Sequence, residues 1–240
     1  MVEIVRASIL GSLPHGFMPQ SHRGNDGSSH EDREADRLLA ARAILPGAQL
    51  ISARQIHSAQ AVIATEPWSA ADAPQADAVV TTLPGLLVGV VTADCAPVLL
   101  ADAKAGVVAA AHAGWRGAAS GIIEASVAAM EQCGANPARI SAAIGPAIAQ
   151  DSYEVDEEFR TFFSAADERY FKPGNKGHYQ FDLEAYVAAK LREAGVGMVE
   201  PLGIDTYTAP DRYHSFRRAT HRGTQAAGRQ FSAIALPRVD

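Results

Sequence analysis

The feature that most constrains this chain is a series of short apolar runs in its middle third, each bounded by a turn. Runs of a few residues that are rich in Val, Leu and Ala and flanked by Gly or Pro are typical of strands buried on both faces. The series therefore predicts several sheet strands that follow one another closely. The runs are AVV (78–80), LLVGVVT (86–92), PVLLAD (97–102) and GVVAAAH (106–112).

Strand and helix signals alternate irregularly along the rest of the chain. Because no regular strand–helix–strand rhythm is present, the order favours an α+β fold with mixed sheets over a doubly wound fold. The helices are expected from apolar spacing, from an N-cap at Asp182 and from glycines at the helix ends. Expected helices cover 31–45, the segment from GWRG (114–117) to Gly134, and 183–195; further strands are expected at 49–56, 139–145, 197–204 and 230–236.

The length of 240 residues favours one domain spanning 1–240. A chain of this size can bury roughly 70% of its unfolded surface, so it needs no disulfide or metal to complete its core. A polar stretch rich in Gly and Ser predicts a variable N-terminal loop at about 18–32.

Charge and hydropathy indicate which partners to expect. The chain carries 21 basic and 27 acidic side chains, a net charge of −6, which argues against a nucleic-acid partner. No apolar run approaches the ~20 residues that span a membrane, and the N-terminus lacks the basic start of a secretion signal. We therefore expect a cytoplasmic protein that acts on small molecules. Its oligomeric state is not indicated by the sequence.

Three side chains with metal-binding or catalytic chemistry fall at the ends of expected strands. They are His57, Cys95 and His112. One thiolate and two imidazoles suit a catalytic zinc ion, which commonly has three protein ligands and an open fourth position. Such an ion lowers the pKa of bound water or polarises a substrate oxygen.

Two other interpretations of the same atoms remain open, and we rank zinc first, a thiol site second and copper third. In the thiol interpretation, His57 or His112 takes the proton of Cys95, which then attacks a substrate without any metal. Two His and one Cys also describe a single copper centre with a weak axial Met. A multicopper oxidase is disfavoured, because the eight histidines include no His-x-His pair and too few remain for a second cluster.

Other polar residues supply candidate substrate contacts. Arg116, in GWRG, precedes an expected helix, where guanidinium and backbone N–H groups favour an anion such as phosphate. Arg217 and Arg218 belong to an arginine-rich segment that suits the same ligand. Asp94, beside Cys95, is a candidate hydrogen-bond partner of the site or proton donor to substrate.

Several nucleotide-binding signatures are absent from the sequence. It has no Walker loop, no Gly-x-Gly-x-x-Gly after a strand, and no His-x-Glu with a later Pro-Cys-x-x-Cys of the familiar zinc deaminases. Any deamination would need a different site architecture.

Eight sequence motifs taken together resemble those of the YfiH-type family, long labelled laccase-like multicopper polyphenol oxidases and also regarded as purine nucleoside phosphorylases. The match runs in register from about Gln49 to Leu236. The motifs are RQIHSA (54–59), ADAVVTTLPG (76–85), VTADCAPVLLAD (91–102), AAHAGWRG (110–117), IGPAI (144–148), YEV (153–155) and SFRR (215–218) with GRQ (228–230).

This resemblance carries implications for the site and the fold. It implies one zinc ion bound by His57, Cys95 and His112. It implies mixed sheets packed between flanking helices, similar to certain cysteine hydrolases. The chain departs from the family after His15-Gly16-Phe17, where the usual loop with Thr-Arg and Val is replaced, so substrate preference is the property most open to change.

The same resemblance implies an activity. It implies phosphorolysis of adenosine, inosine and 5′-methylthioadenosine to the free base and a ribose 1-phosphate, together with some adenosine deamination. Some similar proteins are implicated in editing peptidoglycan precursors, which keeps a cysteine or metal hydrolase as an alternative. A copper polyphenol oxidase is the remaining alternative.

Overall fold

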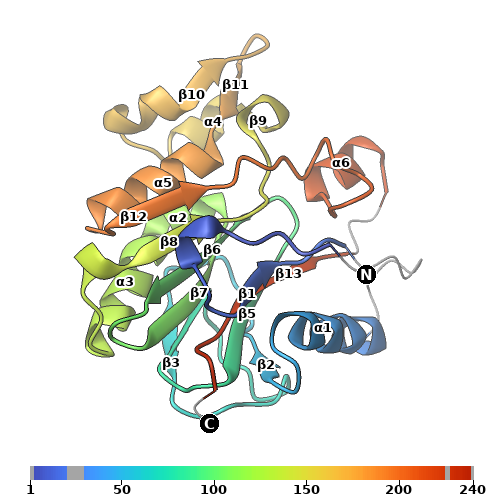
Figure 1. The fold of residues 1–240 in the computed structure, drawn as a ribbon. Helices are drawn as coiled ribbons and strands as arrows, with labels where there is room; N and C mark the ends of the chain where they lie inside the picture. The colour runs from blue at the N-terminus through green and yellow to red at the C-terminus, as the bar shows by residue number, and fades with distance from the viewer. Residues whose placement is uncertain (1–2, 21–29, 225–227, 239–240) are drawn as a thin grey trace.

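A computed structural model describes residues 3–20, 30–224 and 228–238, so most of the expected variable loop lies outside the described residues. The four apolar runs form strands, and these belong to two mixed sheets (Figure 1). The six-stranded sheet has the order β12 (Met198–Pro201), β8 (Ser141–Ile144), β6 (Ala96–Asp102), β7 (Val107–Ala113), β4 (Ala78–Thr81) and β3 (Ala61–Ala64). The four-stranded sheet has the order β1 (His15–Phe17), β13 (Gln230–Ile234), β5 (Leu86–Thr92) and β2 (Gln49–Ile51).

Both sheets combine parallel and antiparallel pairs. In the larger sheet, β6, β7, β8 and β4 pair antiparallel, while β12 and β3 add in parallel at the two edges. In the smaller sheet, β13 pairs antiparallel with both neighbours and β2 joins β5 in parallel. The expectation of an α+β fold built on mixed sheets is confirmed.

Helices cover the two outer faces of the paired sheets (Figure 1). One of them packs on the four-stranded sheet and two of the others pack on the six-stranded sheet. The helices are α1 (His30–Ile44), α2 (Trp115–Ser120), α3 (Ile122–Gln132), α4 (Glu157–Arg160), α5 (Leu183–Glu193) and α6 (Phe216–His221), with 3-10 turns η1 (Ser8–Leu10), η2 (Pro137–Arg139), η3 (Gln150–Ser152) and η4 (Ala165–Tyr170).

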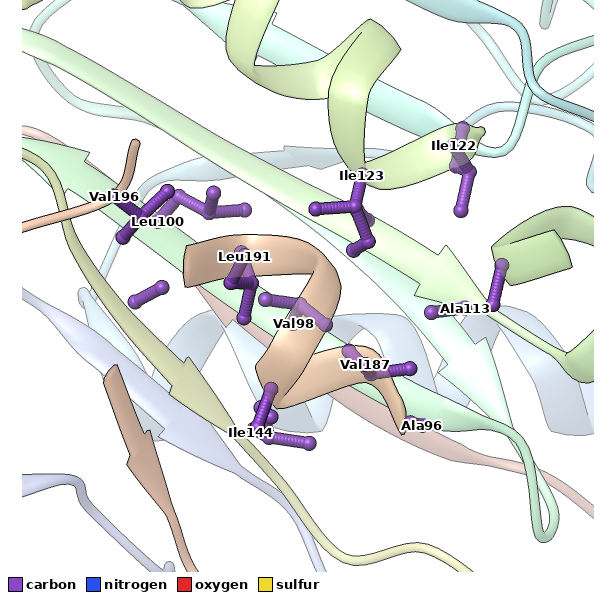
Figure 2. Packing of buried hydrophobic residues seen from close by; sticks show 14 of the residues in the cluster. Ala96, Val98, Leu100, Ala113, Ile122, Ile123, Ile144, Val187, Leu191 and Val196 are labelled. Carbon is purple, nitrogen blue, oxygen red and sulfur yellow. The ribbon is translucent and has the colours of Figure 1, made fainter. Parts of the chain in front are cut away.

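Successive side chains of the central strands point to opposite faces of the sheet, and this defines the layers. Leu99 of β6 and Ala110 of β7 face Val88 of β5, in an apolar layer between the two sheets. Val98 and Leu100 of β6 point the other way, toward α3 and α5. Figure 2 shows this outer packing, in which Val187 and Leu191 of α5 lie over β6. Because both faces are buried, these strands have continuous apolar sequences rather than alternating ones.

The outer face of the smaller sheet packs against α1. Leu87 of β5 and Phe231 of β13 share an apolar cluster with Ala40 and Ile44 of α1. The order of layers is therefore α1, the four-stranded sheet, the six-stranded sheet, and then α3 with α5 (Figure 1). The expected flanking helices are confirmed.

Two expectations about individual elements are wrong. The helix expected from GWRG to Gly134 is two helices, because Gly121 adopts a left-handed conformation with φ 100° and ends α2 before α3 begins. The strand expected at 49–56 ends at Ile51. Beyond it, the side chain of Gln55 donates to Val91 O and accepts from Val91 N, both at 2.8 Å, in place of a backbone ladder.

A small antiparallel sheet lies beyond α5 and contributes to the same apolar cluster (Figure 1). Its core contains several aromatic rings, including Phe163 and Phe181, whose centroids lie 4.8 Å apart. The sheet has the order β10 (Phe171–Pro173), β11 (His178–Phe181) and β9 (Glu154–Asp156). None of the helices in the described part of the chain is long and apolar enough to cross a membrane.

Candidate metal centre and its cavity

His57, Cys95 and His112 meet at one end of the layer between the sheets. Their nearest ligand atoms all lie within 4.8 Å of one another, and Cys95 Sγ is 4.0 Å from His57 Nε2. The two imidazole rings meet edge to face, with centroids 4.7 Å apart. His112 is buried, Cys95 is half-buried and His57 is exposed, so the group opens to solvent on the His57 side.

Each ligand reaches this position by a different route. His112 lies in β7 and points the same way as Ala110, toward the second sheet. Cys95 directly precedes β6, in the short connection from β5. The expectation that all three residues end strands is wrong for His57, which lies in a loop with a left-handed φ of 58°. That conformation is uncommon for a side chain larger than glycine and needs support from its surroundings.

Asp77 supplies this support. Its fully buried carboxylate accepts the backbone N–H groups of Ile56, His57 and Ser58 at 3.3, 3.0 and 2.6 Å, and the Ser58 hydroxyl at 2.8 Å. The same carboxylate lies 2.8 Å from His112 Nδ1. It therefore fixes the His57 loop and also leaves His112 Nε2 free to face Cys95.

The donor set and its surroundings fit a zinc ion. Tetrahedral bonds of about 2.0–2.3 Å place neighbouring donor atoms about 3.3–3.6 Å apart, so small side-chain movements bring this group to bonding distance. Asp77 holds the ring nitrogen of His112 on the side away from Cys95, as carboxylates commonly do for metal-binding histidines. A His-Cys-His group with one exposed side keeps room for a fourth ligand.

The electrostatics of the group favour a thiolate. Burial raises the pKa of Cys95, but the hydrogen bonds to His112 and His57 outweigh burial and lower that pKa to about 6. Burial lowers the pKa of His112, but Asp77 and Cys95 outweigh it and raise that pKa to about 9. Burial likewise opposes ionisation of Asp77, yet its bonds to His112 and Ser58 hold its pKa well below the usual range. A thiolate is both a zinc ligand and a nucleophile.

Gly114 allows the three ligands to approach. A Cβ at this position would lie 2.9 Å from Cys95 Sγ and 3.1 Å from His57 Cδ2. The antiparallel register pairs Pro97 with His112, which brings the residue after Ala113 opposite Cys95. The first glycine of GWRG is therefore a requirement of the ligand cluster as well as of the turn into α2.

The cluster faces a cavity of about 1550 Å³. Its walls come from the loops at 52–57 and 70–73, from the small sheet and from α6. The volume exceeds that of ordinary small-molecule pockets, which measure roughly 300–1000 Å³. The cavity therefore has room for a substrate with more than one chemical part.

The expected arginines have different surroundings. Arg116 is exposed, lines the cavity and lies over the Trp115 ring, with 4.4 Å from Cζ to the centroid. Arg217 also lines the cavity, and its Nη1 donates to Glu154 O at 2.6 Å. Arg218 does not line the cavity, because its guanidinium donates to the backbone carbonyls of Thr206, Tyr207 and Tyr213.

Asp94 is buried and connects the cluster to α6. Its carboxylate accepts from the Thr206 hydroxyl at 2.6 Å, the Ser215 hydroxyl at 3.0 Å and Arg217 N at 2.6 Å. The carboxylate that contacts a ligand imidazole is that of Asp77, which the sequence reasoning overlooked. One signal was present, since a metal-binding His usually has a carboxylate partner and Asp77 directly precedes the apolar run 78–80, which was expected to form a strand.

Comparison with known proteins places the chain in a family. Residues 20–237 match the family described as multi-copper polyphenol oxidoreductase laccase, and the chain belongs to it. The resemblance inferred from the motifs is also confirmed by structure. The crystal structure of the Bacillus licheniformis protein YfiH superposes with a TM-score of 0.81 at 26% identity, covering 92% of each chain.

The curated relatives carry names from nucleoside metabolism. A Rickettsia conorii protein named purine nucleoside phosphorylase is 38% identical over 85% of this chain and 86% of its own length. A protein named adenosine deaminase, from an unknown prokaryotic organism, is 39% identical over 61% of this chain and 60% of its own length. These names support an enzyme that acts on purine nucleosides.

Proposed function

We propose that this protein is a zinc-dependent phosphorylase of adenosine, inosine and 5′-methylthioadenosine, with adenosine deamination as a side activity. The observation that carries the proposal is the His57–Cys95–His112 group at the wall of a large cavity that Arg116 and Arg217, among other arginines, also line. The names of the relatives supply the substrate class. We further propose that it works in the cytoplasm, where a reducing environment keeps Cys95 available.

The three ligand side chains would hold the metal, and Asp77 would orient His112 and the His57 loop. A zinc ion bound there would supply a Lewis acid for a substrate oxygen and, for deamination, an acidified water. Arg116 and Arg217 bind the phosphate, since guanidinium groups suit phosphate oxygens. Asp94 acts as a positioning residue, because its carboxylate already accepts three hydrogen bonds from the segments that carry α6.

The proposed reaction balances as a transfer of the ribosyl group. A phosphate oxygen forms a bond to C1′ while the bond between C1′ and the base nitrogen breaks. The base takes the bonding electron pair and, by way of water, the proton that the phosphate loses on forming its ester bond, and leaves as the neutral purine. The protein contributes mainly by holding phosphate and nucleoside together and by balancing the phosphate charge.

A second candidate, a hydrolase with Cys95 as nucleophile, is favoured by one observation. Cys95 Sγ has the imidazole of His57 at 4.0 Å, an arrangement that can also activate a thiol for attack on a cell-wall precursor. Multicopper chemistry is not proposed, because the described residues contain a single His, Cys, Asp and Glu group able to hold a metal. One copper ion in place of zinc is an outcome that metal analysis identifies.

The test is an assay of purified protein with inosine. Release of hypoxanthine should require phosphate, stop when a chelator removes the metal, and return when zinc is added. Release without phosphate would identify a hydrolase, and activity that survives complete metal removal would favour the thiol candidate. No release by the zinc-loaded protein would overturn the proposal.

A further inference from the structure

Phe216, the first residue of α6, lines the cavity with an exposed aromatic ring. Its exposed fraction is 56%, and it takes part in no ring contact found among the described residues. Phe162 is similarly exposed at 59%, but its ring packs 5.1 Å from that of Trp115, and Phe162 does not line the cavity. Phe216 therefore presents an unpaired ring to whatever enters the cavity.

The position of Phe216 relative to the ligand cluster is fixed from both sides. Asp94, the neighbour of Cys95, accepts hydrogen bonds from the Ser215 hydroxyl and from Arg217 N. Ser215 also caps α6, since its oxygen accepts from Arg218 N at 3.1 Å. The residues before and after Phe216 are thus both bonded to the residue next to a candidate metal ligand.

Polar groups surround the ring, which limits the chemistry of its partner. Arg217 and His221, on the same helix, also line the cavity. Tyr207 Oη and His221 Nδ1 lie 2.9 Å apart, so His221 has its other ring nitrogen for a ligand. A flat apolar face bordered by hydrogen-bonding groups suits a heteroaromatic ring better than an aliphatic chain.

We propose that Phe216 stacks on the purine base of the substrate and thereby holds the nucleoside beside the metal cluster. This inference rests on the proposed function and deepens it, because it assigns the base to Phe216 and leaves the phosphate to Arg116 and Arg217. Stacking on an aromatic side chain depends on the π face of the base, so both adenosine and inosine are accepted.

The test measures equilibrium binding of adenosine, inosine and inorganic phosphate by calorimetry. Phe216→Ala should weaken binding of both nucleosides about 5- to 150-fold, the range for removal of one base–aromatic stack. Its affinity for phosphate should stay within twofold. Phe216→Trp should keep nucleoside binding, whereas Phe216→Leu, which is apolar without a π face, should lose most of it.

Phe162→Ala is the matched control, because it removes an equally exposed ring that does not line the cavity. The inference is overturned if Phe216→Ala binds nucleosides as the wild type does, or if Phe162→Ala weakens binding as much. If the wild type binds adenosine through Phe216 but never releases adenine, the stacking site stands and phosphorolysis falls. If the Phe216→Ala and Phe162→Ala variants both release base as the wild type does, phosphorolysis stands and the stacking site falls.

Discussion

His112 Nδ1 and the Asp77 carboxylate lie 2.8 Å apart, and the backbone N–H of His112 donates to Asp77 O at 2.7 Å. The two residues are thus joined through both side chain and backbone. This pairing couples the orientation of one candidate ligand to the loop that carries another, His57, whose N–H donates to the same carboxylate.

Asp77→Asn should weaken metal binding about 10- to 100-fold, the usual effect of removing the carboxylate partner of a ligand histidine. The amide loses the charge that holds His112 and accepts fewer of the N–H groups in the His57 loop. Competition with a chromogenic chelator measures the change. Asp72→Asn, at an exposed aspartate that pairs with Ser69, should leave affinity unchanged, and equal affinity in both variants would contradict the assignment.

Cys95→Ser should lower the zinc content of purified protein and its phosphorolytic activity together. A hydroxyl stays protonated at neutral pH and is a weak zinc ligand compared with a thiolate. Metal analysis beside the inosine assay gives both readouts. Cys133→Ser is the control, because Cys133 lies at the C-terminal end of α3, outside the cluster. Burial raises the pKa of its thiol. Full zinc content with lost activity would instead support a nucleophilic cysteine.

Gly114→Ala should reduce metal affinity while the protein still folds. The added methyl group would sit 2.9 Å from Cys95 Sγ, closer than such atoms approach, so the thiol or His57 must move away from the metal position. Gly114 has an ordinary φ of −67°, and alanine adopts it without backbone strain. Circular dichroism should match the wild type while chelator competition shows weaker binding. If the variant binds metal as tightly as the wild type, the cluster accommodates the added methyl group and the assigned role of Gly114 is wrong.

Asp102→Asn should destabilise the protein at neutral pH and flatten its acid unfolding curve. Burial raises the pKa of the fully buried Asp102 carboxyl, but Asn136 N and Arg139 outweigh burial and hold that pKa below its usual 3.8. A carboxyl whose pKa is lower in the folded than in the unfolded state stabilises the fold at pH values above its unfolded-state pKa. This stabilisation is lost as pH falls below about 4.

Loss of the charged hydrogen bonds of Asp102 should cost about 1–3 kcal/mol of unfolding free energy at pH 7. Urea unfolding at pH 7 and at pH 3 measures the free energy of unfolding on both sides of the transition. Asp151→Asn provides the comparison, because that carboxylate is 89% exposed and its ion pair with Lys172 contributes little. A variant that loses as much stability at pH 3 as at pH 7 would contradict the role of the charge.

The sequence predicted the parts of the fold that depend on local pattern. The runs that became β4 to β7 are apolar on both faces, and that composition has few alternatives to a buried strand. The short strand His15–Phe17 was missed, because three residues carry little pattern and the strand depends on its pairing with Gln230–Ile234. Gly121 was overlooked as a helix break, because apolar spacing continues across it.

In the site, too, local sequence predicted some residues, whereas the roles of others depend on contacts between distant segments. Side-chain chemistry, the ends of expected strands and the family motifs together selected His57, Cys95 and His112. The role of Asp77 depends on the pairing of β4 with β7, a contact between residues far apart in sequence, and no local pattern shows it. Arg218 looked equivalent to Arg217 because composition gives no indication that its guanidinium is occupied by backbone carbonyls.

The separation of the three ligands along the chain has a consequence for how the ion enters and leaves. Hydrogen bonds to Asp77 and the pairing of β6 with β7 hold the backbone around the ligands, so many contacts besides metal bonds define the shape of this region. We therefore expect the fold to survive chelation, unlike that of zinc fingers, which unfold when the metal is removed. Stripping and reloading should therefore be reversible in the native state, and different divalent ions can be compared on one unchanged framework.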